Sequence, residues 1–151
     1  MSHSRPCRVL IVDDNVASAK TLGWMAERED REIRMCHDGV VAIKICDEFK
    51  PDIIFLDLGM RGMNGIEVCQ ILRRDYAAVD MLIVAQTGWG DDRTRQKTSE
   101  AGFDDHLVKP IRPDIFESTI AAVERRIARI AVEQLSLPSS AAPPKSQLCL
   151  G

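Results

Sequence analysis

Three acidic residues, a threonine and a lysine lie just beyond short apolar runs of this chain. Apolar runs of this kind are typical of buried strands, and polar residues at strand ends are where doubly wound sheets bind their ligands. The runs and the residues that follow them are Val9–Val12 with Asp13 and Asp14, Ile53–Leu56 with Asp57, Met81–Ala85 with Thr87, and His106–Val108 with Lys109.

These residue types together suit phosphoryl transfer. Crowded carboxylates repel one another, and a hard divalent cation such as Mg²⁺ relieves that repulsion through oxygen ligands. A carboxylate can also attack phosphorus to form an acyl phosphate. Asp57 stands alone at its strand end and is the candidate nucleophile, while Asp13 and Asp14 are candidate metal ligands. The Lys109 ammonium and the Thr87 hydroxyl can hold phosphoryl oxygens.

The elements that position these residues alternate along the chain. The apolar runs do not alternate with polar residues, so they predict strands covered on both faces. Glu32–Cys36 is a weaker strand candidate. Five segments of helical length follow the strands, and the sequence predicts an α/β fold with a doubly wound parallel sheet. The predicted helices are Asn15–Glu29, Asp38 to about Pro51, a segment capped by Asn64 and Glu67, Asp91–Ala101 stopped by Gly102, and Pro113–Leu135.

Composition narrows the class of protein. The chain has 151 residues and a formal net charge of −3, which suits one domain and argues against non-specific nucleic-acid binding. No apolar run or leader indicates a membrane span or secretion, so we expect a cytoplasmic protein with no membrane partner. Five scattered cysteines and three separated histidines predict no zinc site.

We expect a tail at 1–6, a folded domain at 7–135 and a disordered tail rich in Pro, Ser and Ala at 136–151.

Over about residues 7 to 130 the chain resembles the receiver domain of response regulators, the CheY-like, flavodoxin-like fold of two-component signalling. The resemblance implies five strands in the order 2-1-3-4-5 flanked by five helices. The residues that carry it are Val12-Asp13-Asp14, Leu56-Asp57, Gly62–Gly65, Thr87-Gly88 and Lys109-Pro110. Receivers associated with hybrid sensor histidine kinases often carry stretches similar to Thr87–Gly90, Ala101–Asp104 and His106–Pro110.

The resemblance also implies roles for individual residues. It implies phosphorylation at Asp57, with Thr87 and Lys109 touching the phosphoryl group. It implies a Mg²⁺ cofactor held by Asp14, Asp57 and the Gly59 carbonyl, with Asp13 acting largely through water. Lys109-Pro110 is then expected to be a cis peptide.

Three positions depart from the family pattern. Arg61 stands where proline is usual, which would make that loop less rigid. His106 replaces the usual Tyr or Phe and, with Thr87, forms the expected switch pair, although a simple strand residue with no switch role fits it as well. Trp89 lies two residues after Thr87, at the mouth of the expected pocket.

The predicted function is that of a stand-alone response regulator. It would accept phosphate from a sensor histidine kinase or a histidine phosphotransfer protein and signal by protein contact. It would catalyse only its own phosphorylation and dephosphorylation. The alternatives are a phosphate sink or shuttle in a phosphorelay and, in another class, a Mg²⁺-dependent phosphohydrolase with an aspartyl nucleophile. Such hydrolases carry Asp-x-Asp after the first strand, whereas Asp13-Asp14 lacks that spacing.

Two surfaces are expected to meet partners. Ala17, Lys20 and Trp24 share the outer side of the first predicted helix and form a candidate docking face, although Trp24 could equally lie flat over its own helix. The last predicted helix exceeds the length of a strand, so Ile127, Ile130 and Leu135 are expected to overhang the sheet. The chain is therefore expected to be a monomer or a weak homodimer that associates through the last predicted helix.

Overall fold

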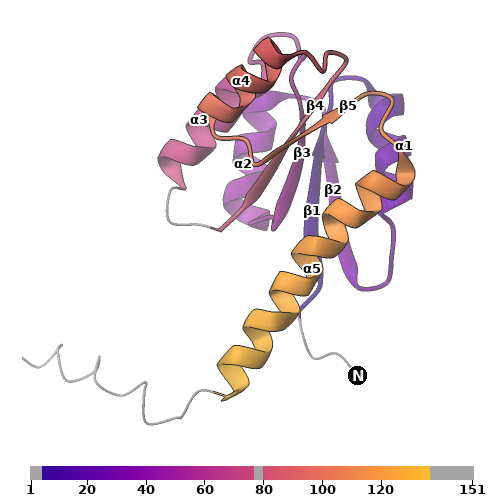
Figure 1. Cartoon of the computed structure of the whole chain (residues 1–151), viewed down its shortest axis with the longest axis vertical. Coiled ribbons are helices and arrows are strands. Elements are labelled where there is room, and N and C mark those ends of the chain that lie inside the picture. Colours follow the sequence, from indigo (N-terminus) through magenta and orange to yellow (C-terminus); the bar gives the residue numbers. More distant parts are fainter. Residues whose placement is uncertain (1–4, 77–79, 137–151) are drawn as a thin grey trace, which may run out of the picture.

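The computed structural model describes residues 5–76 and 80–136, and within them strands and helices alternate as the sequence predicts. The elements occur in the order of the chain (Figure 1). They are β1 (Cys7–Val12), α1 (Val16–Ala26), β2 (Arg31–Cys36), α2 (Gly39–Phe49), β3 (Ile53–Asp57), α3 (Gly65–Asp75), β4 (Leu82–Thr87), α4 (Asp92–Ala101), β5 (Asp105–Val108) and α5 (Pro113–Ser136).

The strands form one parallel sheet in the order β2-β1-β3-β4-β5, which confirms the predicted fold. α1 and α5 cover one face, and α2, α3 and α4 cover the other (Figure 1). Alternate residues of the central strands enter opposite layers: Ile54 packs with the second group of helices and Phe55 with the first. Both faces are therefore apolar, which is why these strands read as continuous apolar runs.

Side-chain caps fix where four of the helices begin. Each cap accepts a hydrogen bond from a backbone N–H of the first turn, which that turn cannot satisfy internally. Asn64 and Glu67 form the reciprocal capping box that the sequence predicted. Gly102 ends α4 with φ of 106°, a left-handed conformation that glycine adopts without steric cost. The four capping residues are Asn15, Asp38, Asn64 and Asp91.

The prediction that the first helix runs to Glu29 was wrong, because α1 ends at Ala26. Two contacts account for the earlier end. The backbone N–H of Glu27 turns back to the Trp24 carbonyl, and the Arg31 guanidinium donates to the Ala26 carbonyl at 3.0 Å. The last-turn carbonyls are thus satisfied by groups outside the helix.

The buried face of α2 is not the one that apolar spacing suggests. Val41, Ile45 and Phe49 recur at helical spacing in the sequence, yet Val41 is 43% exposed. The buried residues are instead Gly39, Ala42, Cys46 and Phe49. Small residues face inward because the helix lies close to α3: a Cβ on Gly39 would come within 2.8 Å of the Val68 side chain.

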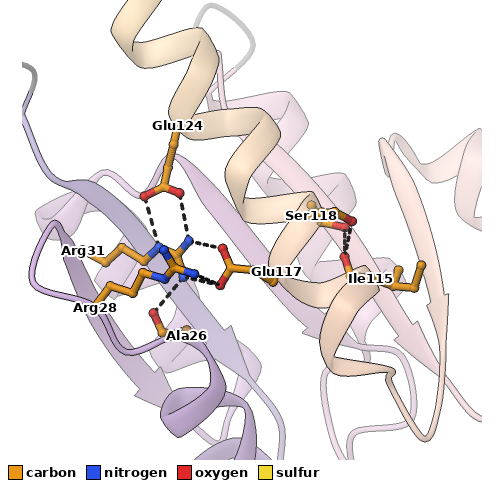
Figure 2. Close-up of polar contacts among 8 residues, drawn as sticks. Ala26, Arg28, Arg31, Ile115, Glu117, Ser118 and Glu124 are labelled. Carbon is orange, nitrogen blue, oxygen red and sulfur yellow. Dashed lines mark hydrogen bonds and ion pairs between the residues drawn. The ribbon is translucent and has the colours of Figure 1, made fainter. Parts of the chain in front are cut away.

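The amino-terminal end of the sheet carries a buried arginine. The Arg31 side chain is fully buried, and its five N–H groups are directed at Glu117, Glu124 and the Ala26 carbonyl (Figure 2). Arg28 adds a second cation 3.5 Å from Glu117. We call these four charged side chains, Arg28, Arg31, Glu117 and Glu124, the Arg31 cluster; it ties β2 to α5.

The first half of α5 packs on the sheet and its last turns extend beyond it (Figure 1). Phe116, Ile120 and Val123 are buried as predicted. The expectation for Ile127 was wrong, because it packs against the core of its own chain. Ile130 and Leu135 are 40% and 80% exposed, so they remain the candidate surface for self-association, which stays a prediction.

Four cysteines are buried in the described residues. Burial raises the pKa of the Cys46 thiol to about 12 and that of Cys69 to about 11, which suppresses the reactive thiolate. No helix among residues 5–76 and 80–136 has the length and apolar character needed to cross a bilayer. The predicted tail at 136–151 lies, apart from Ser136, outside the described residues.

Candidate functional site

The three aspartates predicted to act together do meet at the carboxyl end of the sheet. Asp13 and Asp14 follow β1, Asp57 ends β3, and ligand oxygens of the three lie within 4.8 Å of one another. Asp13 is fully buried and Asp57 is 6% exposed, whereas Asp14 is exposed. We call this group the acidic cluster. Parallel strands explain the convergence, since their carboxyl ends share one edge of the sheet.

Lys109 supplies the cation that faces the acidic cluster. Its Nζ lies 3.2 Å from Asp13 Oδ2 and 3.3 Å from Asp57 Oδ1. The Lys109-Pro110 peptide is cis, as expected from the resemblance. Burial alone would lower the Lys109 pKa, but the charges of Asp57 and Asp13 raise it, so the ammonium stays protonated.

The Asp57 carboxylate is held in an unfavourable environment for its charge. Burial raises its pKa, and the neighbouring charge of Asp13 raises it further. The Gly59 N–H, which donates to Asp57 Oδ1 at 3.1 Å, and the Lys109 ammonium act in the opposite direction without cancelling these effects. Three carboxylates facing one ammonium therefore leave an excess of negative charge that a bound cation can offset.

Two backbone contacts fix the loops around the acidic cluster. The Asn15 N–H donates to Asp13 Oδ1 at 2.9 Å, which orients that carboxylate at the start of α1. The Arg61 N–H donates to Asp14 Oδ2 at 3.2 Å. Proline has no N–H, so the arginine at position 61 allows a contact that the family's usual residue could not make. The departure at position 61 thus joins the β3–α3 loop to Asp14.

A hollow of about 320 Å³ lies over Asp57. It is lined by Thr87 at the end of β4 and Trp89 just after it, together with Asp57 and Gly59. Thr87 is buried, and its Oγ1 accepts from the Trp89 N–H at 3.1 Å. Trp89 is 76% exposed, in agreement with its expected place at the mouth of the pocket.

His106 does not line this hollow; it contacts the β4–α4 connection and α4. Its Nε2 is 3.2 Å from the Trp89 carbonyl oxygen, and its Nδ1 is 3.3 Å from Thr98 Oγ1. The Thr98 hydroxyl itself donates to the Arg95 carbonyl, so its oxygen is left to accept. His106 thus bridges the backbone of Trp89 and the side chain of Thr98 on α4.

The candidate docking face lies on α1, which begins just after Asp13 and Asp14. Ala17, Lys20 and Trp24 are all exposed on α1, and Trp24 is 73% exposed. The predicted orientation of this face is therefore confirmed. Its role in docking stays a prediction.

Comparison with known protein families gives a match to the response regulator receiver domain over residues 9–121. The chain belongs to this family. Receiver domains are signalling domains of two-component systems, generally without enzymatic turnover, and this match favours a response regulator over the phosphohydrolase considered above.

Individual relatives agree with the receiver family. The DNA-binding response regulator MtrA of Mycobacterium tuberculosis is 33% identical over 130 residues, covering 86% of this chain and 56% of MtrA. The transcriptional regulatory protein ResD of Bacillus subtilis is 32% identical over 139 residues, covering 92% and 57%. The signal receiver domain of a DNA-binding response regulator from Colwellia psychrerythraea superposes with a TM-score of 0.74 at 25% identity, covering 79% of this chain and 98% of that domain.

This chain spans about half the length of the curated relatives it matches. Two of these three similar proteins are described as DNA-binding, so the expected lack of a nucleic-acid partner for this chain stays a prediction.

Receiver domains typically bind Mg²⁺ in their acidic pocket, and the donor set of this chain fits that ion. Carboxylate oxygens are hard ligands, and the exposed Asp14 gives access from solvent. Asp14 and Asp57, with the Gly59 carbonyl, are the residues we expect to hold Mg²⁺. Asp13 already contacts Lys109 and the Asn15 N–H, which suits it to a role through water.

Sequence reasoning missed three residues around the site. His37 lies 2.9 Å through Nδ1 from the Asp13 carbonyl oxygen, which places the hydrogen on that nitrogen. Lys97 of α4 lines the hollow over Asp57. Gln86 is fully buried on β4, opposite Asp57 in the register. Only Gln86 carried a signal in the sequence, as a polar residue inside an apolar run.

Proposed function

We propose that this chain is the phosphoacceptor of a two-component system and receives a phosphoryl group on Asp57 from a histidine kinase or a histidine phosphotransfer protein. One observation carries the proposal: a nearly buried Asp57 lies 3.3 Å from Lys109 inside a cluster with two further aspartates. A cluster with excess negative charge is costly unless a ligand cation completes it.

Each residue of the site has its own role in the proposed phosphoryl transfer. Asp57 Oδ1 is held by the Gly59 N–H and Lys109, which leaves Oδ2 to attack phosphorus. An O–P bond forms, the P–N bond to the donor imidazole breaks, and its electron pair returns to that nitrogen. Lys109 and the Thr87 hydroxyl bind the transferred oxygens. Bound Mg²⁺ supplies charge neutralisation and a template for the incoming phosphoryl group.

The central test uses intact mass after incubation with acetyl phosphate and Mg²⁺. The wild-type chain gains the mass of one phosphoryl group, and Asp57→Asn gains none. Asp75→Asn, which alters an exposed aspartate on α3, is the matched control and should behave as the wild type. A full mass gain by Asp57→Asn would refute the proposal.

The docking face of α1 is proposed to receive the histidine-bearing partner. An exposed tryptophan beside Ala17 and Lys20 offers a large contact area of the kind enriched at interfaces. Trp24→Ala should slow transfer from the cognate phosphohistidine protein about tenfold, in the range of a moderate interface residue, while acetyl phosphate labels it normally. Equal slowing with both donors would place the defect in the active site instead.

Thr87 and His106 are proposed to form the switch pair. When the Thr87 hydroxyl turns toward a phosphoryl group, it no longer accepts the hydrogen bond from the Trp89 N–H. His106 contacts the carbonyl oxygen of the same Trp89. His106 therefore links Thr98 on α4 to the peptide that would move. Partner affinity of phosphorylated His106→Tyr should differ from that of the phosphorylated wild type; equal affinities would make His106 a bystander.

Whether the signal ends at a target protein or returns to a second histidine separates a carrier from a phosphate sink or shuttle. We propose the carrier. Transfer of label from the phosphorylated chain back to a histidine protein faster than its hydrolysis would favour the shuttle instead.

A further inference from the structure

A pocket of about 440 Å³ lies on the α1–α5 side of the sheet, next to the acidic cluster, with Asp13 and Lys109 in its wall. Its volume falls within the range of about 300–1,000 Å³ typical of small-molecule sites. Most of its wall is apolar or weakly polar and comes from α1 and the β5–α5 connection. The lining residues used below are Thr21, Leu22, Met25, Gln86, Lys109 and Ile111.

Gln86 distinguishes this pocket from a simple apolar crevice. It points to the same side of β4 as Val84, which packs in the α1–α5 layer, because strand residues two apart share a face. Among the described residues, its side chain is the buried polar group for which neither Nε2 nor Oε1 has a hydrogen-bond partner. A buried amide without partners destabilises the protein, so a ligand that supplies partners gains affinity.

We propose that this pocket binds a small neutral molecule with an apolar body and a carboxamide or lactam group that pairs with the Gln86 amide. The Gln86 amide offers a donor and an acceptor side by side, and an amide ligand presents the complementary pair. Leu22, Met25 and Ile111 receive the apolar body.

Charge selects a neutral ligand over an anion. Asp13 and Lys109 both line this pocket and are paired with each other, and the acidic cluster beyond them has more carboxylates than cations. A carboxylate ligand would be repelled there and could only accept hydrogen bonds, which leaves the Gln86 oxygen unpaired. Gln86 lines the pocket although its side chain is fully buried, so a ligand must displace part of the pocket wall to pair with it. Met25, which is half-buried and flexible, is the lining side chain that we expect to move.

The test titrates the full chain with benzamide and, separately, with toluene, in EDTA and without a phosphoryl donor. The side-chain NH₂ resonances of Gln86, assigned by their loss in Gln86→Met, report contact directly. Benzamide should shift them and saturate at millimolar concentration. It should bind at least about tenfold more tightly than toluene, because two hydrogen bonds to the Gln86 amide are gained.

Variants separate the amide pairing from general apolar binding. Gln86→Met should weaken benzamide at least about tenfold while toluene binds as well or better. Thr21→Phe, at the exposed edge of the pocket, should weaken both, and Gln70→Met on the exposed side of α3 should weaken neither. Equal affinity of benzamide for wild type and Gln86→Met, or no shift of the Gln86 resonances at millimolar benzamide, overturns the proposal.

Discussion

The two ends of the sheet differ in the balance between their positive and negative side chains. In the Arg31 cluster, two arginines face two glutamates, and every N–H of the fully buried Arg31 is directed at an acceptor. At the other end, three aspartates face the single ammonium of Lys109. The first arrangement is complete within the chain. The second keeps an excess of negative charge that a bound cation would offset, and this is the end where we propose that the phosphoryl group is received.

Removing the cation of the balanced end should have the largest effect. Arg31→Met leaves Glu117 and Glu124 without their buried partner, and we expect a loss of about 3–5 kcal/mol in the free energy of unfolding. Urea denaturation measures it. Arg74→Met, an exposed arginine paired with the adjacent Asp75, is the control and should leave the free energy of unfolding nearly unchanged. If Arg31→Met lowered the free energy of unfolding no more than the control does, the Arg31 cluster would not stabilise the fold.

Neutralising a carboxylate should have opposite signs at the two ends. In EDTA, Asp57→Asn removes one charge from the overcrowded end and should raise the free energy of unfolding by about 1 kcal/mol. Glu124→Gln removes a charge from the balanced end and should lower it. Added Mg²⁺ should stabilise the wild type more than Asp57→Asn. If Asp57→Asn is destabilising in EDTA, the acidic cluster carries no excess of repulsion.

The pH dependence of Glu117 should give the smallest effect. The hydrogen bonds from Arg31, together with the charges of Arg31 and Arg28, lower the Glu117 pKa below its usual value. The carboxylate therefore contributes stability above a pH of about 4.5, and that contribution is lost as pH falls through the lowered pKa. The difference in urea midpoint between wild type and Glu117→Gln should be largest near pH 7 and shrink below pH of about 4.5. A constant difference would exclude the ion pair as its source.

The strands, the helix caps and the acidic cluster were predictable because they depend on local signals. Apolar runs, capping residues and the residues that follow each strand are all visible within a few positions of Asn64 or Asp57. The Arg31–Glu117 contact was not, since it joins residues 86 apart in the chain. The inward face of α2 was missed because close helix packing at Gly39, rather than hydrophobicity, sets it.

The location of the phosphoryl group tests the central claim most directly. An acyl phosphate on aspartate is reduced by borohydride to homoserine, with release of phosphate, so peptide mass spectrometry identifies the modified residue. After treatment with acetyl phosphate and Mg²⁺, the account predicts homoserine at position 57 and unmodified aspartate at 13 and 14. Homoserine at Asp13 or Asp14, or phosphate retained on His37 or His106, would contradict it.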